Sequence, residues 1–204
     1  MVKIPFFVPY FYPKRVWHFS RREKTIYLTF DDGPIPEITP WVLKELKKYH
    51  AKATFFCIGK NIEENSTIFK QISLEGHTVG NHTFNHLNAN KVSDKEYTEN
   101  TVKAEPYFEK GAKLFRPPYG KLNSKKANLL LSKGYKIIMW DVLSADFDQS
   151  ITEERCLKNV MKNTREGSVV IFHDSKKAAK NLQYVLPKML AHFSEKGYAF
   201  KAIH

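Results

Sequence analysis

The sequence contains little cysteine and no long hydrophobic run. Its only two cysteines are Cys57 and Cys156, and both lie in apolar stretches, so we expect them in the core rather than in a disulfide framework. No apolar run is long enough to cross a bilayer. The apolar start, MVKIPFFVPYFYP, is interrupted by three prolines and no small-residue cleavage site follows it, which makes it a poor signal peptide. These absences predict a cytoplasmic location without a transmembrane segment, although export stays open.

Acidic residues are also few relative to basic ones. The chain of 204 residues has 21 Asp and Glu against 33 Lys and Arg, a formal charge of +12. This excess favours anionic partners such as phosphate polymers, acidic glycans or a membrane surface. The basic residues are spread along the chain without a zinc-finger pattern or an aromatic-rich RNA-binding strand, so no specific nucleic-acid interaction is predicted. The 42% hydrophobic and 26% charged residues predict a globular fold rather than disorder.

The chain divides into an N-terminal arm and one main domain. Residues 1–22 are rich in proline and aromatic side chains, and we expect this arm to pack in extended form on the domain of residues 23–204. From Thr25 onward, strand-like apolar runs alternate with amphipathic helical patterns, which predicts an α/β fold with a parallel sheet of seven strands. The expected strands cover residues 25–30, 53–58, 77–80, 113–115, 136–140, 168–172 and 198–202. The expected helices cover residues 40–49, 62–74, 94–109, 124–131, 152–163 and 178–193.

The stretch TIYLTFDDGP places two carboxylates at the end of a predicted strand. Thr25 to Phe30 alternate as a buried strand does, and Gly33-Pro34 ends it with a turn. Asp31 and Asp32 are adjacent like charges, each of which raises the pKa of the other unless a cation or hydrogen-bond donors offset the repulsion. A metal ion is the simplest such partner. The alternative is an ordinary polar turn, where Asp and Gly are common.

His82 and His86 are the next candidates. Their spacing of four puts both imidazoles on one face if the segment forms a helical turn, where they can share a metal ion. The alternative is a pair of surface or capping histidines. A zincin carries Glu where this chain has Thr83, so a catalytic base must come from elsewhere, and Asp31 is available. Two His and one Asp leave open positions for water and substrate, which suits catalytic zinc and also iron(II).

Further polar residues follow the later predicted strands. Arg116 opens RPPYG, where two prolines stiffen the loop and Tyr119 can offer its backbone N–H; a rigid turn is the alternative. His173, in VVIFHDS, is either a buried structural residue or a general acid oriented by Asp146. Asp141 and Asp174 occupy similar positions. Because the carboxyl ends of parallel strands share one edge, these residues converge there and predict a catalytic site.

The motifs TFDDGP, HxxxH, RPPYG, WDVLSADFD and VVIFHDS occur in this order and spacing. Together they resemble the polysaccharide deacetylases of carbohydrate esterase family 4, the NodB-homology domain, from about Lys24 to the C-terminus. The resemblance implies a distorted seven-stranded relative of the TIM barrel. It also implies metal-dependent removal of N-acetyl groups from amino sugars of a glycan such as peptidoglycan, a chitin-like oligomer or a related precursor. Zinc is the expected metal, with cobalt, nickel or other divalent ions as alternatives.

The resemblance also assigns roles to the first two motifs. The first aspartate of the family's first motif is the catalytic base, which falls on Asp31. The second is a metal ligand, which falls on Asp32. The two motif histidines, which complete the metal site, fall on His82 and His86.

The last three motifs carry the remaining roles. The arginine that braces the base falls on Arg116, and the backbone N–H that helps to bind the oxyanion falls on Tyr119. The general acid falls on His173 and its aspartate partner on Asp146. One departure is visible, because Phe147 stands where the family usually has Trp; the apolar wall is kept but the indole N–H is lost.

Other functions remain open from the residues. An O-acetyl esterase would use the same site on an easier leaving group. A non-catalytic glycan-binding module is expected to have lost the base or the acid, and both are present here. An iron(II) oxygenase fits the ligand set but leaves Asp31, Arg116 and His173 without a role. The basic charge also permits a nucleic-acid role, which a salt-sensitive binding assay tests.

Overall fold

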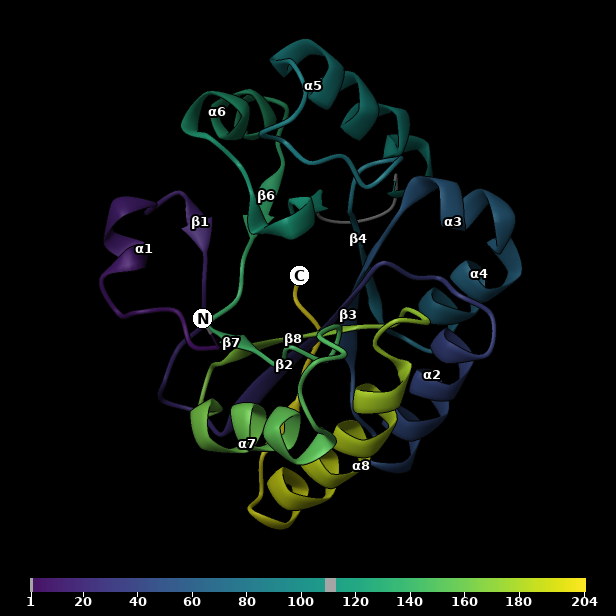
Figure 1. Ribbon diagram of the computed structural model, residues 1–204, viewed down its shortest axis with the longest axis vertical. Helices are drawn as coiled ribbons and strands as arrows, with labels where there is room; N and C mark the ends of the chain where they lie inside the picture. The colour runs from purple at the N-terminus through teal and green to yellow at the C-terminus, as the bar shows by residue number, and fades with distance from the viewer. Residues whose placement is uncertain (1, 109–112) are drawn as a thin grey trace.

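The computed structural model describes residues 2–108 and 113–204 of the chain. Its nine strands form one sheet that curls into an incomplete barrel with helices on the outside (Figure 1). Hydrogen-bonded neighbours follow the order β1-β6-β5-β4-β3-β2-β8-β7, and β9 pairs with the first residues of β2. All these pairings are parallel. The strands are β1 (Arg15–Val16), β2 (Thr25–Asp31), β3 (Ala53–Cys57), β4 (Thr78–Asn81), β5 (Leu114–Phe115), β6 (Lys136–Ile138), β7 (Val142–Leu143), β8 (Val169–His173) and β9 (Ala199–Phe200).

Strand β2 lies at the centre of the sheet. It pairs with β3 on one side and β8 on the other, and the ring of Phe30 stacks on those of Phe55 and Phe172 at centroid distances of 5.0 and 5.9 Å. Six of its seven residues are buried, as a β-branched and aromatic run predicts. The register sets Asp31 opposite His173. Parallel pairing therefore brings the ends of these two strands to the same edge of the sheet.

The helices cover the outer face of the sheet. Side-chain caps fix three of their starts: Ser93 accepts a hydrogen bond at the start of α5, Asn123 at α6 and Thr152 at α7. Each such cap is worth about 1 kcal/mol. The helices are α1 (Val8–Phe11), α2 (Ile38–Lys48), α3 (Gly59–Glu64), α4 (Ser66–Leu74), α5 (Asp94–Lys103), α6 (Ser124–Ser132), α7 (Glu153–Asn163) and α8 (Ala179–Glu195), with 3-10 turns at Glu105–Phe108 and Pro118–Gly120.

The seven expected strands correspond to β2–β6, β8 and β9. The two further strands, β1 and β7, have two residues each, which is too short for a periodic pattern to reveal. The helix expected over residues 62–74 is divided at Asn65, whose φ of −134° is not helical. The helix expected to reach Glu109 ends at Lys103, because Pro106 has no N–H to continue the hydrogen bonding. Glu109 itself lies outside the described residues.

The N-terminal arm connects the two ends of the strand order. Its first residues pair antiparallel with β7, where Ile4 N donates to the Asp141 carbonyl at 3.1 Å and Lys3 bridges Val142. Its last part joins the opposite end of the sheet as β1, parallel to β6. Between these contacts it forms helix α1, which the expected extended form did not include. The arm therefore spans the opening between β6 and β7 that would otherwise leave both edges unpaired.

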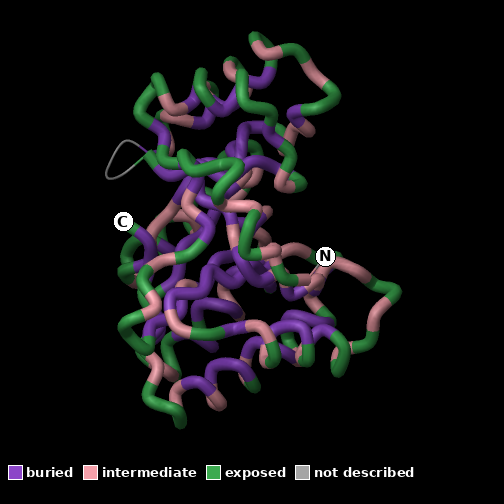
Figure 2. The backbone as a smooth tube through the Cα atoms, turned by 90° about the vertical axis from the view of Figure 1, so that its left-hand side faces the viewer, coloured by how far each residue is buried: buried purple, intermediate pink, exposed green. Residues whose placement is uncertain are grey.

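The core lies on both faces of the curled sheet. In Figure 2 the buried parts of the chain run through the interior, and the exposed parts follow the outer turns of the helices and the loops. The largest cluster joins β2, β3 and β8 to helices α2, α7 and α8. Both cysteines are buried and unbonded, as expected. In the described ranges, no helix combines the length and the apolar character that crossing a bilayer requires.

Candidate active site

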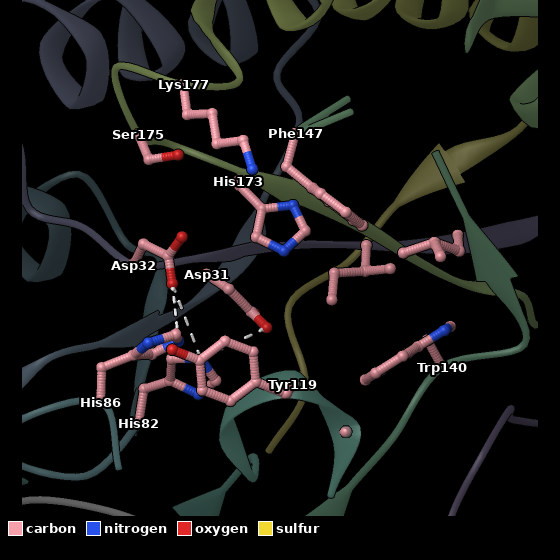
Figure 3. A pocket seen from close by; sticks show the side chains of 13 residues that line it. Asp31, Asp32, His82, His86, Tyr119, Trp140, Phe147, His173, Ser175 and Lys177 are labelled. Carbon is pink, nitrogen blue, oxygen red and sulfur yellow. Dashed lines mark ion pairs between the residues drawn. The ribbon is translucent and has the colours of Figure 1, made fainter. Parts of the chain in front are cut away.

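A cavity of about 410 Å³ opens at the carboxyl ends of the strands. Six of the eight predicted site residues line it, and Figure 3 shows them converging from separate strand ends. They are Asp31, Asp32, His82, His86, Tyr119 and His173. The other two, Arg116 and Asp146, are fully buried, and each forms a hydrogen bond with a residue of the cavity. The fold thus brings all eight residues together at one edge of the sheet.

The two adjacent aspartates reach this cavity from the turn that ends β2. In a regular strand, consecutive side chains point to opposite faces. Here Asp32 has a left-handed φ of 84°, and this local reversal lets both carboxylates line the cavity. The turn is held by Asn61, whose side chain donates to the Asp32 carbonyl at 2.7 Å. The backbone N–H of Asp32 donates to the carbonyl of Phe56 at 3.3 Å.

Asp174 packs against the same turn from the end of β8. It is fully buried, and its carboxyl group accepts hydrogen bonds from Gly33 N at 3.0 Å and Thr39 Oγ1 at 2.5 Å. Burial raises the pKa of Asp174 to about 8, against the effect of the Thr39 hydrogen bond. In the sequence, only its place at the end of a predicted strand marks this residue. Asp174 therefore ties the turn that carries Asp31 and Asp32 to the strand that carries His173.

Gly33→Ala is expected to displace this turn. A Cβ atom at position 33 would lie 2.0 Å from Asp174 Oδ2, so the carboxylate or the turn must move. Overpacking of this kind costs about 1–3 kcal/mol of unfolding free energy, measurable by denaturant titration. The control is a double-mutant cycle with Asp174→Ala, which removes the clashing atoms. If the two effects are strictly additive, the contact between Gly33 and Asp174 does not constrain the turn.

His82 and His86 meet in a loop rather than on a helix. The helical turn that would have explained their spacing is not formed, because the segment after β4 contains the left-handed residues Thr83 (φ 64°) and His86 (φ 55°). Hydrogen bonds shape this loop instead: Thr83 N donates to Asn81 Oδ1 at 2.8 Å, and Leu87 N to Thr83 Oγ1 at 3.2 Å. The two imidazole centroids are 5.1 Å apart, so the loop achieves the closeness that helical spacing suggested.

Asp32, His82 and His86 form a cluster that fits a metal ion. Their candidate ligand atoms all lie within 4.8 Å of one another. Asp32 Oδ1 is 3.3 Å from His86 Nε2 and 3.8 Å from His82 Nε2, yet it is buried without an aligned hydrogen-bond partner in the described part of the chain. A buried carboxylate oxygen without a donor is costly. A cation bound among the three residues removes this cost.

The tautomer of His82 supports the same conclusion. Its Nδ1 lies 2.8 Å from the Arg116 carbonyl oxygen, which can only accept, so Nδ1 carries the proton. Burial lowers the pKa of His82 to about 4, despite the nearby charge of Asp31. The ring is therefore neutral at pH 7, and its Nε2 presents a lone pair toward the carboxylates. Two facing acceptors need a cation between them, and a carbonyl-anchored imidazole is the usual form of a metal-binding histidine.

Arg116 holds Asp31 in place. The guanidinium is completely buried and donates from Nη1 to Asp31 Oδ1 at 2.8 Å and to Thr29 Oγ1 at 2.7 Å. Its remaining nitrogens donate to the carbonyls of Ile138 and Met139. A buried ion pair in which every guanidinium nitrogen is hydrogen-bonded fixes the orientation of the carboxylate. The second oxygen of Asp31 stays on the cavity side, 3.8 Å from His82 Nε2.

His173 lies on the other side of the two aspartates from His82 and His86 (Figure 3) and pairs with Asp146. His173 Nδ1 lies 2.8 Å from Asp146 Oδ1, and the His173 backbone N–H donates to Asp146 Oδ2 at 2.8 Å. Asp146 is fully buried. Burial alone would lower the pKa of His173, but the Asp146 carboxylate raises it to about 9. The imidazole is therefore protonated at neutral pH, and its Nε2 is the nitrogen that remains available to the cavity.

Aromatic and aliphatic side chains form the walls. The Tyr119 ring lies against His86 at a centroid distance of 4.6 Å, in a turn where Tyr119 has a φ of 59°. Phe147, which replaces the usual Trp, packs edge-on against His173 at 5.0 Å and 76°. Trp140 and Leu143 also line the cavity. In the sequence they look like ordinary strand residues, so only the curvature of the sheet reveals them as part of the site.

Asp141 does not belong to the cavity. The sequence places it at the same rim, but its carboxylate forms an ion pair with Arg21 at 2.8 Å and accepts from Val169 N at 2.8 Å. These contacts attach the arm to β8. The expectation that Asp141 joins the site is therefore wrong, because its side chain points to the arm.

A comparison with known proteins agrees with this geometry. The profile of a family described as polysaccharide deacetylase matches residues 19–138. The chain belongs to this family. A peptidoglycan-N-acetylglucosamine deacetylase of Bacillus cereus is 36% identical to this family member over 191 residues, which are 92% of this chain and 90% of that protein. A chitooligosaccharide deacetylase of Azorhizobium caulinodans is 34% identical over 160 residues, 76% of each chain.

The fold of this polysaccharide deacetylase family member is also shared with solved structures. One is a peptidoglycan N-acetylglucosamine deacetylase in complex with 4-naphthalen-1-yl-N-oxidanyl-benzamide. It superposes with a TM-score of 0.89 at 30% identity, covering 98% of this chain and 95% of that one. The expected family and the expected distorted (β/α) barrel of the NodB type are therefore confirmed.

Proposed function

We propose that this protein is a metal-dependent deacetylase that hydrolyses N-acetyl groups on the amino sugars of a glycan. The observation that carries the proposal is the arrangement of one cavity: a braced carboxylate, a three-residue metal cluster and a protonated histidine all face the same space. Hydrolysis of an amide needs a base for the attacking water and an acid for the leaving nitrogen. Both are present beside a site for a Lewis acid.

Asp32, His82 and His86 would hold the metal ion. Two imidazoles and one carboxylate leave an open position, as catalytic zinc sites do, so we propose zinc as the resident ion. When bound, a divalent ion polarises a carbonyl oxygen and lowers the pKa of water from about 15.7 to roughly 7. Burial keeps His82 neutral, as a ligand must be. The nearby imidazoles lower the pKa of Asp32 even though burial opposes its ionisation, so its carboxylate is charged.

Asp31 takes the proton from the attacking water in this proposal. The guanidinium of Arg116 occupies one carboxylate oxygen and leaves the other to accept the proton. Addition of the water oxygen to the acetyl carbon gives a tetrahedral oxyanion. In this proposal the backbone N–H of Tyr119, a residue that lines the cavity, donates to the oxyanion, and one such donor is typically worth about 3 kcal/mol.

His173 completes the reaction. Its Nε2 proton passes to the amide nitrogen as the C–N bond breaks, which releases acetate and the free amino sugar. Asp146 keeps the ring charged and fixes Nδ1. The walls formed by Trp140, Leu143 and Phe147 suit the apolar acetyl methyl group. The substrates named for the relatives, peptidoglycan and chitooligosaccharides, support a glycan of N-acetylated hexosamines as substrate.

The pH profile is expected to end with the titration of His173. Because the acid must be protonated and its pKa is about 9, kcat/KM should fall as the pH rises through about 9. Asp146→Asn removes the charge that raises this pKa, so its alkaline limb should move to lower pH by at least about one pH unit. The measurement is kcat/KM against pH for both proteins. Alkaline limbs that coincide would show that Asp146 does not set the protonation of His173.

The test of the function itself is acetate release. Protein stripped of metal is compared with protein resupplied with zinc, cobalt or nickel, on N-acetylglucosamine oligomers, peptidoglycan fragments and an O-acetylated sugar. Metal-restored release from the N-acetylated substrates is expected. Release of acetate from the O-acetylated sugar alone would show that the protein is an esterase. If no acetate is released from any substrate although the metal site is full, the remaining function is non-catalytic glycan binding.

A further inference from the structure

The N-terminal arm presents an unusual group of exposed aromatic side chains. Phe6, Phe7, Tyr10 and Phe11 are 82%, 49%, 79% and 74% exposed. The rings of Phe6, Phe7 and Phe11 contact one another edge to face, at centroid distances of 5.8 and 6.4 Å. We call these four residues the aromatic cluster. Large apolar side chains gathered in this way, rather than scattered singly, mark an interaction surface.

The charged side chains of the arm are all of one sign. Residues 1–22 contain five basic and no acidic side chains. Arg15 and Arg21 are engaged inside the protein, with the Leu122 carbonyl and with Asp141. Lys3, Lys14 and Arg22 are exposed, and none of them takes part in an ion pair within residues 2–108 and 113–204. Lys14 and Phe11 border the same hollow.

The segment that carries the aromatic cluster is attached to the barrel at both of its ends. Hydrogen bonds tie residues 2–4 to β7, and β1 pairs with β6, so both ends of the segment are attached to the barrel. In Figure 2 the segment that leaves the N-terminus projects from the body of the molecule, and its tip is exposed. One attachment point is next to the cavity, because the backbone N–H of Leu143, which lines the cavity, donates to the Val2 carbonyl of the arm at 2.7 Å.

We propose that the aromatic cluster and its flanking cations dock this protein on the surface of an anionic lipid bilayer. Phenylalanine rings enter the boundary between head groups and acyl chains, tyrosine rings lie at the head-group level, and lysine and arginine bind anionic head groups. Three of the four cluster residues are Phe, which has no polar atom to hydrogen-bond a sugar. Their edge-to-face packing also differs from the flat platform on which a sugar ring stacks. Docking would hold the catalytic cavity beside the membrane.

The test is co-sedimentation with two kinds of vesicle, one of phosphatidylcholine alone and one in which about 30 mol% of the lipid is phosphatidylglycerol. This anionic fraction is chosen to saturate the electrostatic attraction. The wild-type protein should bind the anionic vesicles, and its binding should weaken as salt is added. The double variant Phe6→Ser, Phe11→Ser should bind at least about tenfold more weakly, because burial of a single Phe side chain in the bilayer strengthens binding by about that factor. Lys3→Gln with Lys14→Gln should reduce binding to anionic vesicles and remove much of its salt dependence.

Leu74→Ser is the matched control. Leu74 is 87% exposed at the end of α4, which lies on the other side of the molecule from α1 in Figure 1, so its loss should leave vesicle binding unchanged. Thermal unfolding of every variant should match the wild type, because the replaced side chains are exposed. Neither readout depends on catalysis. No binding by the wild-type protein, or equal binding by the Phe variant, would overturn the proposal; a dimer that the Phe variant dissociates, without vesicle binding, would assign the surface to a second copy.

Discussion

Asp31→Asn is expected to lower the rate of deacetylation by about 10²- to 10⁴-fold, the usual contribution of a positioned base. Asparagine has nearly the same shape, and its side-chain oxygen can still accept the hydrogen bond that Arg116 makes at 2.8 Å. It cannot take a proton from water. Because Asp31 is not one of the three clustered ligands, the variant should retain its metal ion. The measurement is kcat together with the metal content of the same preparation.

A matched control separates the loss of the base from the loss of a charge. Asp148 lies two residues after Asp146 but is not among the residues that line the cavity, and its carboxylate accepts a hydrogen bond from the Ser150 hydroxyl. Asp148→Asn should keep wild-type activity within about twofold, as surface changes do. His173→Ala should resemble Asp31→Asn, with slow turnover and a full metal site. Wild-type turnover in either active-site variant would show that the acid and base are assigned to the wrong residues.

Asp32→Ala is expected to abolish stoichiometric metal binding. Removing a residue that only orients a ligand typically costs 10–100-fold in metal affinity, so loss of a direct ligand should cost at least about 100-fold. The variant also removes a buried oxygen that has no aligned hydrogen-bond partner among the described residues, which offsets part of the strain of alanine at a φ of 84°. The measurement is zinc content after dialysis, with zinc titration calorimetry for the affinity.

Histidine replacements extend this test within one residue type. His82→Ala and His86→Ala should empty the site in the same way, whereas His18→Ala should not, because His18 is exposed on the arm and lies outside the cluster. A variant of Asp32, His82 or His86 that still holds one metal ion per chain would remove that residue from the ligand set. If all three variants hold one metal ion per chain, the metal ion binds elsewhere. The activity of Asp31→Asn must then be interpreted without a metal ion at this cluster.

The local pattern of the sequence was sufficient to predict most of the secondary structure. Apolar alternation located β2 to within one residue, and the amphipathic runs located α6, α7 and α8 to within two residues at each end. These elements carry their own signal, because burial of one face requires a period of two in a strand and 3.6 in a helix. No such signal marks β1 and β7, which are strands because β6 and β8 pair with them.

The site shows the same division. The rule that polar residues gather at the carboxyl ends of parallel strands placed Asp31, Arg116 and His173 at one edge, where the structure also has them, because parallel pairing aligns those ends whatever the loops do. The rule did not say which way a side chain turns, and it wrongly included Asp141. The left-handed backbone at Asp32, Thr83 and His86 decides that the metal cluster closes, and such a conformation depends on hydrogen bonds from distant segments.

The sequence by itself therefore determined the order of strands and helices, the family and the eight candidate residues, because these follow from local periodicity and from motifs within short stretches. Only the tertiary structure decided the distances within the metal cluster, the Asp146 contact that raises the pKa of His173, the burial that lowers the pKa of His82, and the exposed aromatic cluster of the arm. The physical reason is that burial, pKa and contact depend on residues far apart in the chain, whose approach is a property of the packed barrel rather than of any single segment.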